Sequence, residues 1–242
     1  QENAGLSAAR MTGVKYASGK FIGFCDSDDL VEASCYRKLA LLAERAGCDV
    51  AVCRSMVFDS VSHVVHDFYD APIWDQVLQG RSCVVTSARR DPQVFRFEPN
   101  ANTRLLRREF MLEKRIEFPL GLHFEDFPVH VEVLAAAGKI LLLDSTGYFY
   151  RVNRPGKITD QKSERRFDIL KAVALGFEAM EKYRVDEAGR AYIAIMAARM
   201  TYWCGKNTLN KARRRFFRAA CEQMAAAIDA SAARYCMKNG ID

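Results

Sequence analysis

The sequence predicts an α/β protein whose C-terminal part is helical. Residues 21–25 (FIGFC) are apolar or small and indicate a short strand buried on both faces. This strand is followed at once by Asp26, Asp28 and Asp29, which places three acids at the carboxyl end of a strand, where open α/β sheets bind their ligands. Beyond Ser163 the pattern changes to long helices. An α/β core followed by a helical region is therefore expected.

Composition limits the function classes. Half of the 242 residues are hydrophobic, which allows a sizeable core, and no run approaches 18 apolar residues. Neither a membrane-spanning helix nor a signal peptide is expected. The eight cysteines show no Cys-x-x-Cys spacing, so reduced thiols in a cytoplasmic protein are expected and a zinc site is not. The net charge of +6 is compatible with a phosphate-bearing ligand or an anionic membrane and does not demand nucleic acid.

The first elements alternate between helix and strand. Apolar residues at near-helical spacing predict a helix over residues 6–17, with Leu6, Ala9, Val14 and Ala17 on its apolar face. After the strand at 21–25, residues 31–46 form an amphipathic pattern closed by Gly47, and residues 49–56 form a second apolar strand.

Patterns weaken between residues 58 and 97. His63, His66, Asp67 and Asp70 match no ligand spacing, so a solvated loop or hairpin is preferred to a metal cluster. A short helix is expected over residues 74–78, and a longer one over residues 103–115 with its apolar residues inside.

A second informative segment covers residues 118–128 (FPLGLHFEDFP). Pro128 suits the first turn of a helix that would continue to Gly138, and Asp126 would then lie at or next to its N-cap. A capping Asp is an ordinary feature, so a structural role for Asp126 stands beside any catalytic one. A buried strand follows at residues 140–143.

Three motifs in order resemble family 2 glycosyltransferases: NAGLSAAR at residues 3–10, Ala-x-Gly at 17–19 and Phe-x-Asp-x-Asp-Asp at 24–29. The resemblance implies a GT-A fold, a Rossmann-like core that binds a nucleotide-sugar donor. It implies a divalent metal, Mg²⁺ or Mn²⁺, held by Asp26 and Asp28, with Asp28 as the direct ligand. It also places Asn3, Gly5, Arg10 and Asp26 among the donor contacts, although Met11 replaces the Asn that commonly follows the Arg.

Two later motifs extend the resemblance to about residue 160. Gly-x-x-x-Glu-Asp at residues 121–126 resembles the family's Glu-Asp motif, which makes Asp126 the catalytic base. Residues 148–159 resemble the segment that closes the catalytic domain, so Arg151, Arg154 and Lys157 either face the donor diphosphate or are simply exposed. In this family an opening βα unit precedes the first motif. The sequence shows no such unit, and the fragment alone is expected to be inactive or nearly so.

The C-terminal region is expected to form helices over residues 164–183, 187–205 and 211–229. Between Arg199 and Arg218 lie seven basic residues and no acid, with Trp203, Phe216 and Phe217 among them. A solvated face over a small bundle is the preferred interpretation. A helix on an anionic membrane is the alternative, and a nucleic-acid arm ranks third because no binding motif accompanies it.

The resulting hypothesis is a glycosyltransferase with a catalytic domain at residues 1–160 and a helical region at 161–242. It would transfer a sugar with inversion to an acceptor hydroxyl on a glycan, a lipid-linked molecule or a small molecule. It would act in the cytoplasm, with peripheral contact with the inner face of the cell membrane as an option and no nucleic-acid partner. A metal-dependent phosphoryl-transfer enzyme and an inactive sugar-nucleotide-binding fragment are the alternatives.

Overall fold

The computed structural model describes residues 2–154, 162–228 and 230–241. Its strands all belong to one sheet: β1 (Phe21–Gly23), β2 (Leu30–Val31), β3 (Val50–Asp59), β4 (Val65–Asp67), β5 (Cys83–Thr86), β6 (Arg104–Arg107) and β7 (Ile140–Val152). The path through the sheet is β1-β6-β3-β7-β2, with β4 paired to β3 and β5 paired to β7. Among the strands that the structure describes, β3 and β7 are the one pair that runs in parallel, so the sheet is mixed.

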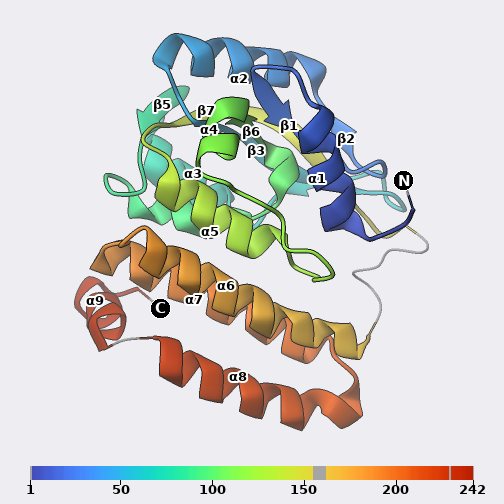
Figure 1. Ribbon diagram of the computed structural model, residues 1–242, viewed down its shortest axis with the longest axis vertical. Coiled ribbons are helices and arrows are strands. Elements are labelled where there is room, and N and C mark those ends of the chain that lie inside the picture. The colour runs from blue at the N-terminus through green and yellow to red at the C-terminus, as the bar shows by residue number, and fades with distance from the viewer. Residues whose placement is uncertain (1, 155–161, 229, 242) are drawn as a thin grey trace.

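Helices surround the sheet and continue beyond it (Figure 1). Those of the first part are α1 (Leu6–Tyr16), α2 (Ala33–Ala46), α3 (Ala71–Leu78), α4 (Arg108–Glu113) and α5 (Asp126–Ala136). Those of the second part are α6 (Asp168–Lys182), α7 (Glu187–Lys206), α8 (Arg213–Ala227) and α9 (Ala230–Asn239). Short 3₁₀ turns are η1 (Pro92–Arg96), η2 (Ala101–Thr103), η4 (Glu164–Phe167) and η5 (Asn210–Ala212).

The helices and the sheet form layers that pack through their apolar faces. Helix α2 covers one face of the sheet with Cys35, Leu39 and Ala43, none of which is exposed. Helix α5 covers the other face, α6 and α7 form the next layer, and α8 is the outermost (Figure 1). Helix α5 is buried along most of its length, as expected for a helix between a sheet and a second helical layer. The helical region therefore shares one hydrophobic core with the sheet.

The pairing of β7 with β3 is interrupted by a β-bulge, and such a bulge bends a strand. On its other edge β7 pairs with two different strands, one on each side of the bend. Its first part pairs with β5 and its later part with β2, and the register with β3 shifts between Cys53 and Ser55. Gly147 lies at this bend, where an added Cβ would stand 2.6 Å from the Cys53 sulfur. Only glycine fits there. The bend carries the end of β7 toward the acidic loop between β1 and β2.

Several expected elements need correction. Strand β1 lies at an end of the sheet and is not buried on both faces: Ile22 is buried, Phe21 is half-buried and Gly23 is exposed. Residues 104–107, expected in a helix, form β6 between β1 and β3, and only 108–113 are helical. Leu30 and Val31 pair with β7, so helix α2 begins at Ala33 with Glu32 as its cap. Helix α9 was not predicted.

Candidate functional site

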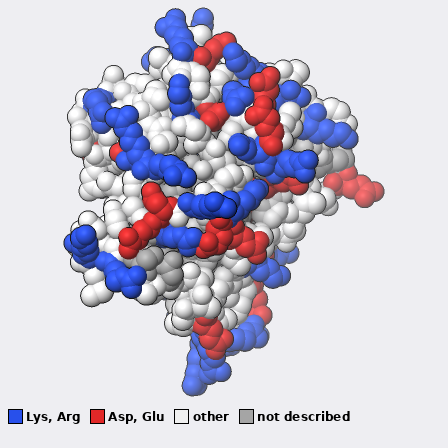
Figure 2. Space-filling model, turned by 60° about the vertical axis from the view of Figure 1, so that its left-hand side comes forward, with Lys and Arg blue, Asp and Glu red and all other residues white. Residues whose placement is uncertain are grey.

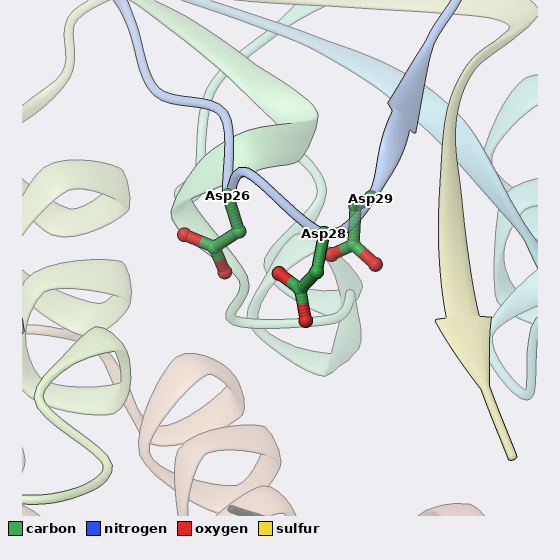
Figure 3. Close-up of side chains that lie close together, drawn as sticks. All are labelled: Asp26, Asp28 and Asp29. Atoms are coloured by element: carbon green, nitrogen blue, oxygen red, sulfur yellow. The ribbon is translucent and has the colours of Figure 1, made fainter. Parts of the chain in front are cut away.

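The three acids of the first motif lie on the loop between β1 and β2 (Figure 3). One carboxylate oxygen from each of Asp26, Asp28 and Asp29 can be chosen so that all lie within 4.8 Å of one another. Oxygen donors at this spacing suit a hard divalent cation such as Mg²⁺ or Mn²⁺. The acids therefore fit the metal that the family resemblance implies.

Asp29 differs from the other two because both its oxygens are already engaged by β7. The Tyr148 hydroxyl donates to Oδ2, and the backbone N–H of Arg151 donates to Oδ1 at 2.7 Å. Burial raises the pKa of Asp29 against the lowering effect of these two hydrogen bonds. Asp29 thus fastens the acidic loop to the sheet, which leaves Asp26 and Asp28 as the residues that would hold a metal.

Arg154 pairs with Asp28 through Nη2 and Oδ2. It lies two residues beyond the end of β7, so the bend in that strand brings a cation to the acidic loop. The Arg151 guanidinium lies 5.5 Å from the centre of the Phe58 ring, and its backbone N–H donates to Asp29. Lys157, the third basic residue of this segment, lies outside the described residues.

Arg10 joins the first motif to the Glu-Asp motif. From α1, its Nη1 contacts Glu125 at 2.9 Å and Asp126 at 2.5 Å, and its Nη2 contacts Asp26 at 3.4 Å. The Arg10 side chain is only 5% exposed, and it lies over Phe118, 5.1 Å from the ring centre. Burial alone lowers the pKa of Arg10, but the three carboxylates raise it above its ordinary value. One buried cation therefore holds the two acidic motifs together.

Asp126 is the first residue of α5, directly after the N-cap Glu125. Its position next to the cap matches the sequence prediction, and its Oδ1 accepts from Arg10. Burial raises the pKa of Asp126 to about 7, the charges of Glu125 and Asp26 add to this rise, and Arg10 opposes it. A carboxyl group with such a pKa can hold or release a proton near neutral pH.

A buried polar network lies beside Asp126. Arg104 donates to Nδ1 of His130 at 3.1 Å and to the Glu98 carbonyl at 2.7 Å. Burial lowers the pKa of His130 well below its usual range, so the neutral ring accepts at Nδ1 and donates from Nε2 to the Phe95 carbonyl. The charge of Arg104 favours the ionised form of Asp126. No motif in the sequence indicated this network.

The remaining predicted donor contacts shape the start of α1. The Asn3 Oδ1 accepts from the Gly5 N–H at 3.2 Å, and Gly5 has a φ of 87°, which favours glycine. A groove of about 420 Å³ runs along α1 and β1 and ends at Asp26. Contrary to the prediction, Leu6 and Ala9 line this groove and are exposed, because α1 turns Ser7, Arg10 and Val14 inward instead. Ala17 lines the groove as well and is partly buried against the core.

The fold is that of the GT-A glycosyltransferases. Crystal structures of S. aureus TarS in complex with UDP and with UDP-GlcNAc superpose with TM-scores of 0.58 and 0.56, at 14% and 12% sequence identity. They cover 97% and 98% of this chain, which covers 71% and 73% of theirs. At this identity the likeness establishes the fold.

Residues 1–121 match the family described as Glycosyl transferase family 2. The chain belongs to that family. It is 30% identical over 161 residues to the uncharacterized glycosyltransferase EpsJ of Bacillus subtilis, covering 66% of this chain and 45% of EpsJ. It is 26% identical over 188 residues to the succinoglycan biosynthesis protein ExoO of Rhizobium meliloti, covering 76% of this chain and 52% of ExoO. The chain thus spans about half the length of these relatives.

Proposed function

We propose that this chain forms the catalytic part of an inverting glycosyltransferase that uses a nucleoside-diphosphate sugar. The observation that carries the proposal is the contact of Arg10 with both Asp26 and Asp126, because it brings the candidate metal ligands and the candidate base to one place. The catalytic unit would comprise residues 1–160 and the helical region residues 161–242.

On the donor side, Asp26 and Asp28 would hold Mg²⁺ or Mn²⁺. When bound, the cation would neutralise charge on the departing diphosphate. Arg10 and Arg154 now balance the acids, and their guanidinium groups match phosphate oxygens. Asn3, Gly5 and Arg151 are proposed further contacts of the donor. The UDP and UDP-GlcNAc bound by TarS support a nucleotide-sugar donor.

On the acceptor side, Asp126 would accept the proton of the attacking hydroxyl. Inversion needs one base and no nucleophilic residue on the protein. Arg10 and Arg104 favour the ionised, proton-accepting form of Asp126. Because the pKa of Asp126 is about 7, the carboxylate is a stronger base than an ordinary Asp at the same pH.

The acceptor would be a glycan, a lipid-linked molecule or a small molecule in the cytoplasm. The name of ExoO, a succinoglycan biosynthesis protein, supports a place in cell-surface polysaccharide synthesis. Among the described residues no helix is both long and apolar enough to cross a bilayer. Peripheral contact with the inner face of an anionic membrane is part of the proposal.

The donor class is tested by calorimetry with UDP in the presence of Mn²⁺, on the protein that contains this chain. A glycosyltransferase site is expected to bind UDP with Mn²⁺ more tightly than inorganic phosphate with Mn²⁺. A phosphoryl-transfer or nuclease-like site would show no such preference, and that result would contradict the proposal.

The base is tested by Asp126→Asn in the protein that contains this chain. The amide cannot accept a proton near neutral pH, so turnover is expected to fall by about 10² to 10⁴ while UDP affinity is retained. Glu125→Gln is the matched control, since Glu125 contacts the same Arg10 nitrogen, and it is expected to lose less. Near-normal turnover of Asp126→Asn would assign that carboxylate a structural role.

A further inference from the structure

The surface where α7 ends and α8 begins carries cations and aromatic rings on one side of the helical layer. Its exposed members, here called the basic corner, are Tyr202, Trp203, Lys206, Lys211, Arg214 and Arg218. Tyr202 is 59% and Trp203 is 43% exposed, which is high for rings of this size. The exposed aromatic area therefore lies among the positive charges.

The cations of the basic corner are available to a partner. Among the described residues, Lys206, Lys211, Arg214 and Arg218 make no ion pair with an acid, whereas the neighbouring Arg215 pairs with Glu164 at 2.7 Å. Basic and acidic side chains alternate across the middle of the face in Figure 2, but the lower end, where α8 lies, carries basic side chains at its tip. The lower end of the molecule thus carries exposed basic side chains of α8 that no acid neutralises by an ion pair among the described residues.

Helix α8 is held with this side outward. Phe216 is fully buried and meets Phe167 edge to face, and Phe217 is partly buried against Phe216 and Tyr202. Two of the three aromatics that the sequence placed on a membrane-facing helix therefore pack inward, as the bundle interpretation expected. The exposed rings come from α7 instead.

The basic corner adjoins the candidate site. Arg166 lies 4.4 Å from the centre of the Trp203 ring, and Trp203 meets Phe124 edge to face with centres 6.4 Å apart. Phe124 immediately precedes the Glu-Asp motif. The corner is therefore continuous with the loop that carries the candidate base.

We propose that the basic corner binds the surface of an anionic lipid bilayer. Unpaired lysines and arginines complement anionic headgroups, and Tyr and Trp prefer the interface between headgroups and water. Nucleic acid fits less well, because Arg166 and Phe124 already occupy neighbouring sides of the Trp203 ring and limit its use for base stacking. Docked in this way, the acceptor side of the site would lie next to the bilayer, a consequence that rests on the proposed function.

The test is co-sedimentation of the full chain with phosphatidylcholine vesicles, with and without phosphatidylglycerol. Each basic residue near an anionic surface strengthens binding by about fivefold, so the triple variant Lys211→Gln, Arg214→Gln, Arg218→Gln should bind about a hundredfold more weakly. The matched control is Arg37→Gln, Lys38→Gln, Arg45→Gln on α2, at the opposite end of the molecule (Figure 1). It removes the same charge and should bind like the unmodified chain. Added salt should weaken binding.

Three outcomes would overturn the proposal: equal loss in both triple variants, equal binding to neutral and anionic vesicles, or binding of single-stranded DNA in place of vesicles. Tyr202→Ser should weaken vesicle binding further without changing the charge. The vesicle measurement uses neither donor nor acceptor. UDP binding by the α8 triple variant therefore tests the proposed function separately.

Discussion

At the scale of single residues, Asp28 and Asp29 are neighbours with different surroundings. Asp28 makes a partly exposed ion pair with Arg154, while Asp29 is fixed by the Tyr148 hydroxyl and the Arg151 N–H. The Tyr148 hydroxyl in turn accepts from Asn102 at 2.8 Å. One acid can therefore exchange its partner for a metal, and the other holds the loop.

This difference predicts opposite effects for two matched variants. Asp28→Asn should weaken Mn²⁺ binding by about tenfold or more, since it removes a charged ligand from a site with few ligands, with little change in stability. Asp29→Asn should lower the free energy of unfolding by about 1–3 kcal/mol, because the amide NH₂ would face a donor. Electron paramagnetic resonance of free Mn²⁺ and urea unfolding measure the two effects.

The reverse result would change the assignment of ligands. The assignment would be reversed if Asp29→Asn lost Mn²⁺ affinity as strongly as Asp28→Asn and kept its stability. Asp29 would then be a metal ligand, and its hydrogen bonds from β7 would contribute little to the free energy of unfolding.

The sequence indicates the acids of the candidate site but not the residue that joins them. Motif spacing indicated Asp26, Asp28 and Asp126, since each follows directly from a local pattern. The position of Arg10 was harder to predict, because an Arg on the buried side of a helix is unusual. Its partners lie 16 to 116 positions away along the chain. The spacing of Ser7, Arg10 and Val14 is helical and marks the buried face, whereas the apolar residues of the same segment indicate a different face.

At the scale of elements, the contact between α5 and α6 connects the helical region to the site. An added Cβ at Gly176 of α6 would stand 2.6 Å from the Phe127 ring. Phe127 is fully buried and follows Asp126 directly. Close packing at Gly176 thus sets the position of the residue next to the candidate base.

Gly176→Ala should therefore destabilise the protein. Overpacking lowers the free energy of unfolding by about 1–3 kcal/mol. The higher helix propensity of Ala raises it by about 1 kcal/mol, which offsets part of this loss. Turnover should fall as well, since Phe127 must move. Gly13→Ala in α1 is the matched control, because no atom lies within 4 Å of its added Cβ, and it should raise the free energy of unfolding by about 1 kcal/mol. Equal stability of the two variants in urea would show that the Phe127 ring can shift away from the added methyl group at little cost in free energy.

Local patterns predicted α1, α2, α5 and the start of β7, but they failed where distant pairing decides the structure. Residues 104–107 adopt a strand because β1 and β3 flank them, although Leu105, Leu106, Phe110 and Met111 fit a helical period. The two residues of β2 are too few to produce a pattern. They pair with β7 beyond the last residue that β5 contacts, where that edge of β7 is otherwise unpaired among the described strands.

At the scale of the whole molecule, several carboxyl groups in and around the candidate site are removed from water: Glu125 and Asp70 are buried, and Asp126, Glu98 and Asp29 are half-buried. Burial raises the pKa of Asp126 and of Glu98 to about 7 each, and it also raises the pKa of Glu125, Asp29 and Asp70. In the unfolded chain such groups lose their protons near pH 4. Between these values the folded protein holds more protons, so its free energy of unfolding should fall as pH rises from about 4.5 to 6.5.

His130 opposes this trend. Burial keeps its pKa well below the usual range, so the unfolded chain binds one more proton at this position as pH falls below about 6.5. At Asp126 and Glu98 together, the folded protein holds about two more protons than the unfolded chain in this pH range. The net difference of about one proton corresponds to a loss of about 1.4 kcal/mol for each unit of rising pH.

Urea unfolding between pH 4.5 and 8 measures this slope. Asp126→Asn and Glu98→Gln should each flatten it and should gain stability relative to the unmodified chain above pH 7, where the buried charge no longer has to form. Glu113→Gln, which removes an exposed carboxyl group, should leave the slope unchanged. A free energy of unfolding that rose between pH 5 and 7 would show that Arg10 and Arg104 keep these carboxyl groups ionised. In that case the carboxylate of Asp126 would remain available as a base well below pH 7, and turnover would persist in the same acidic range.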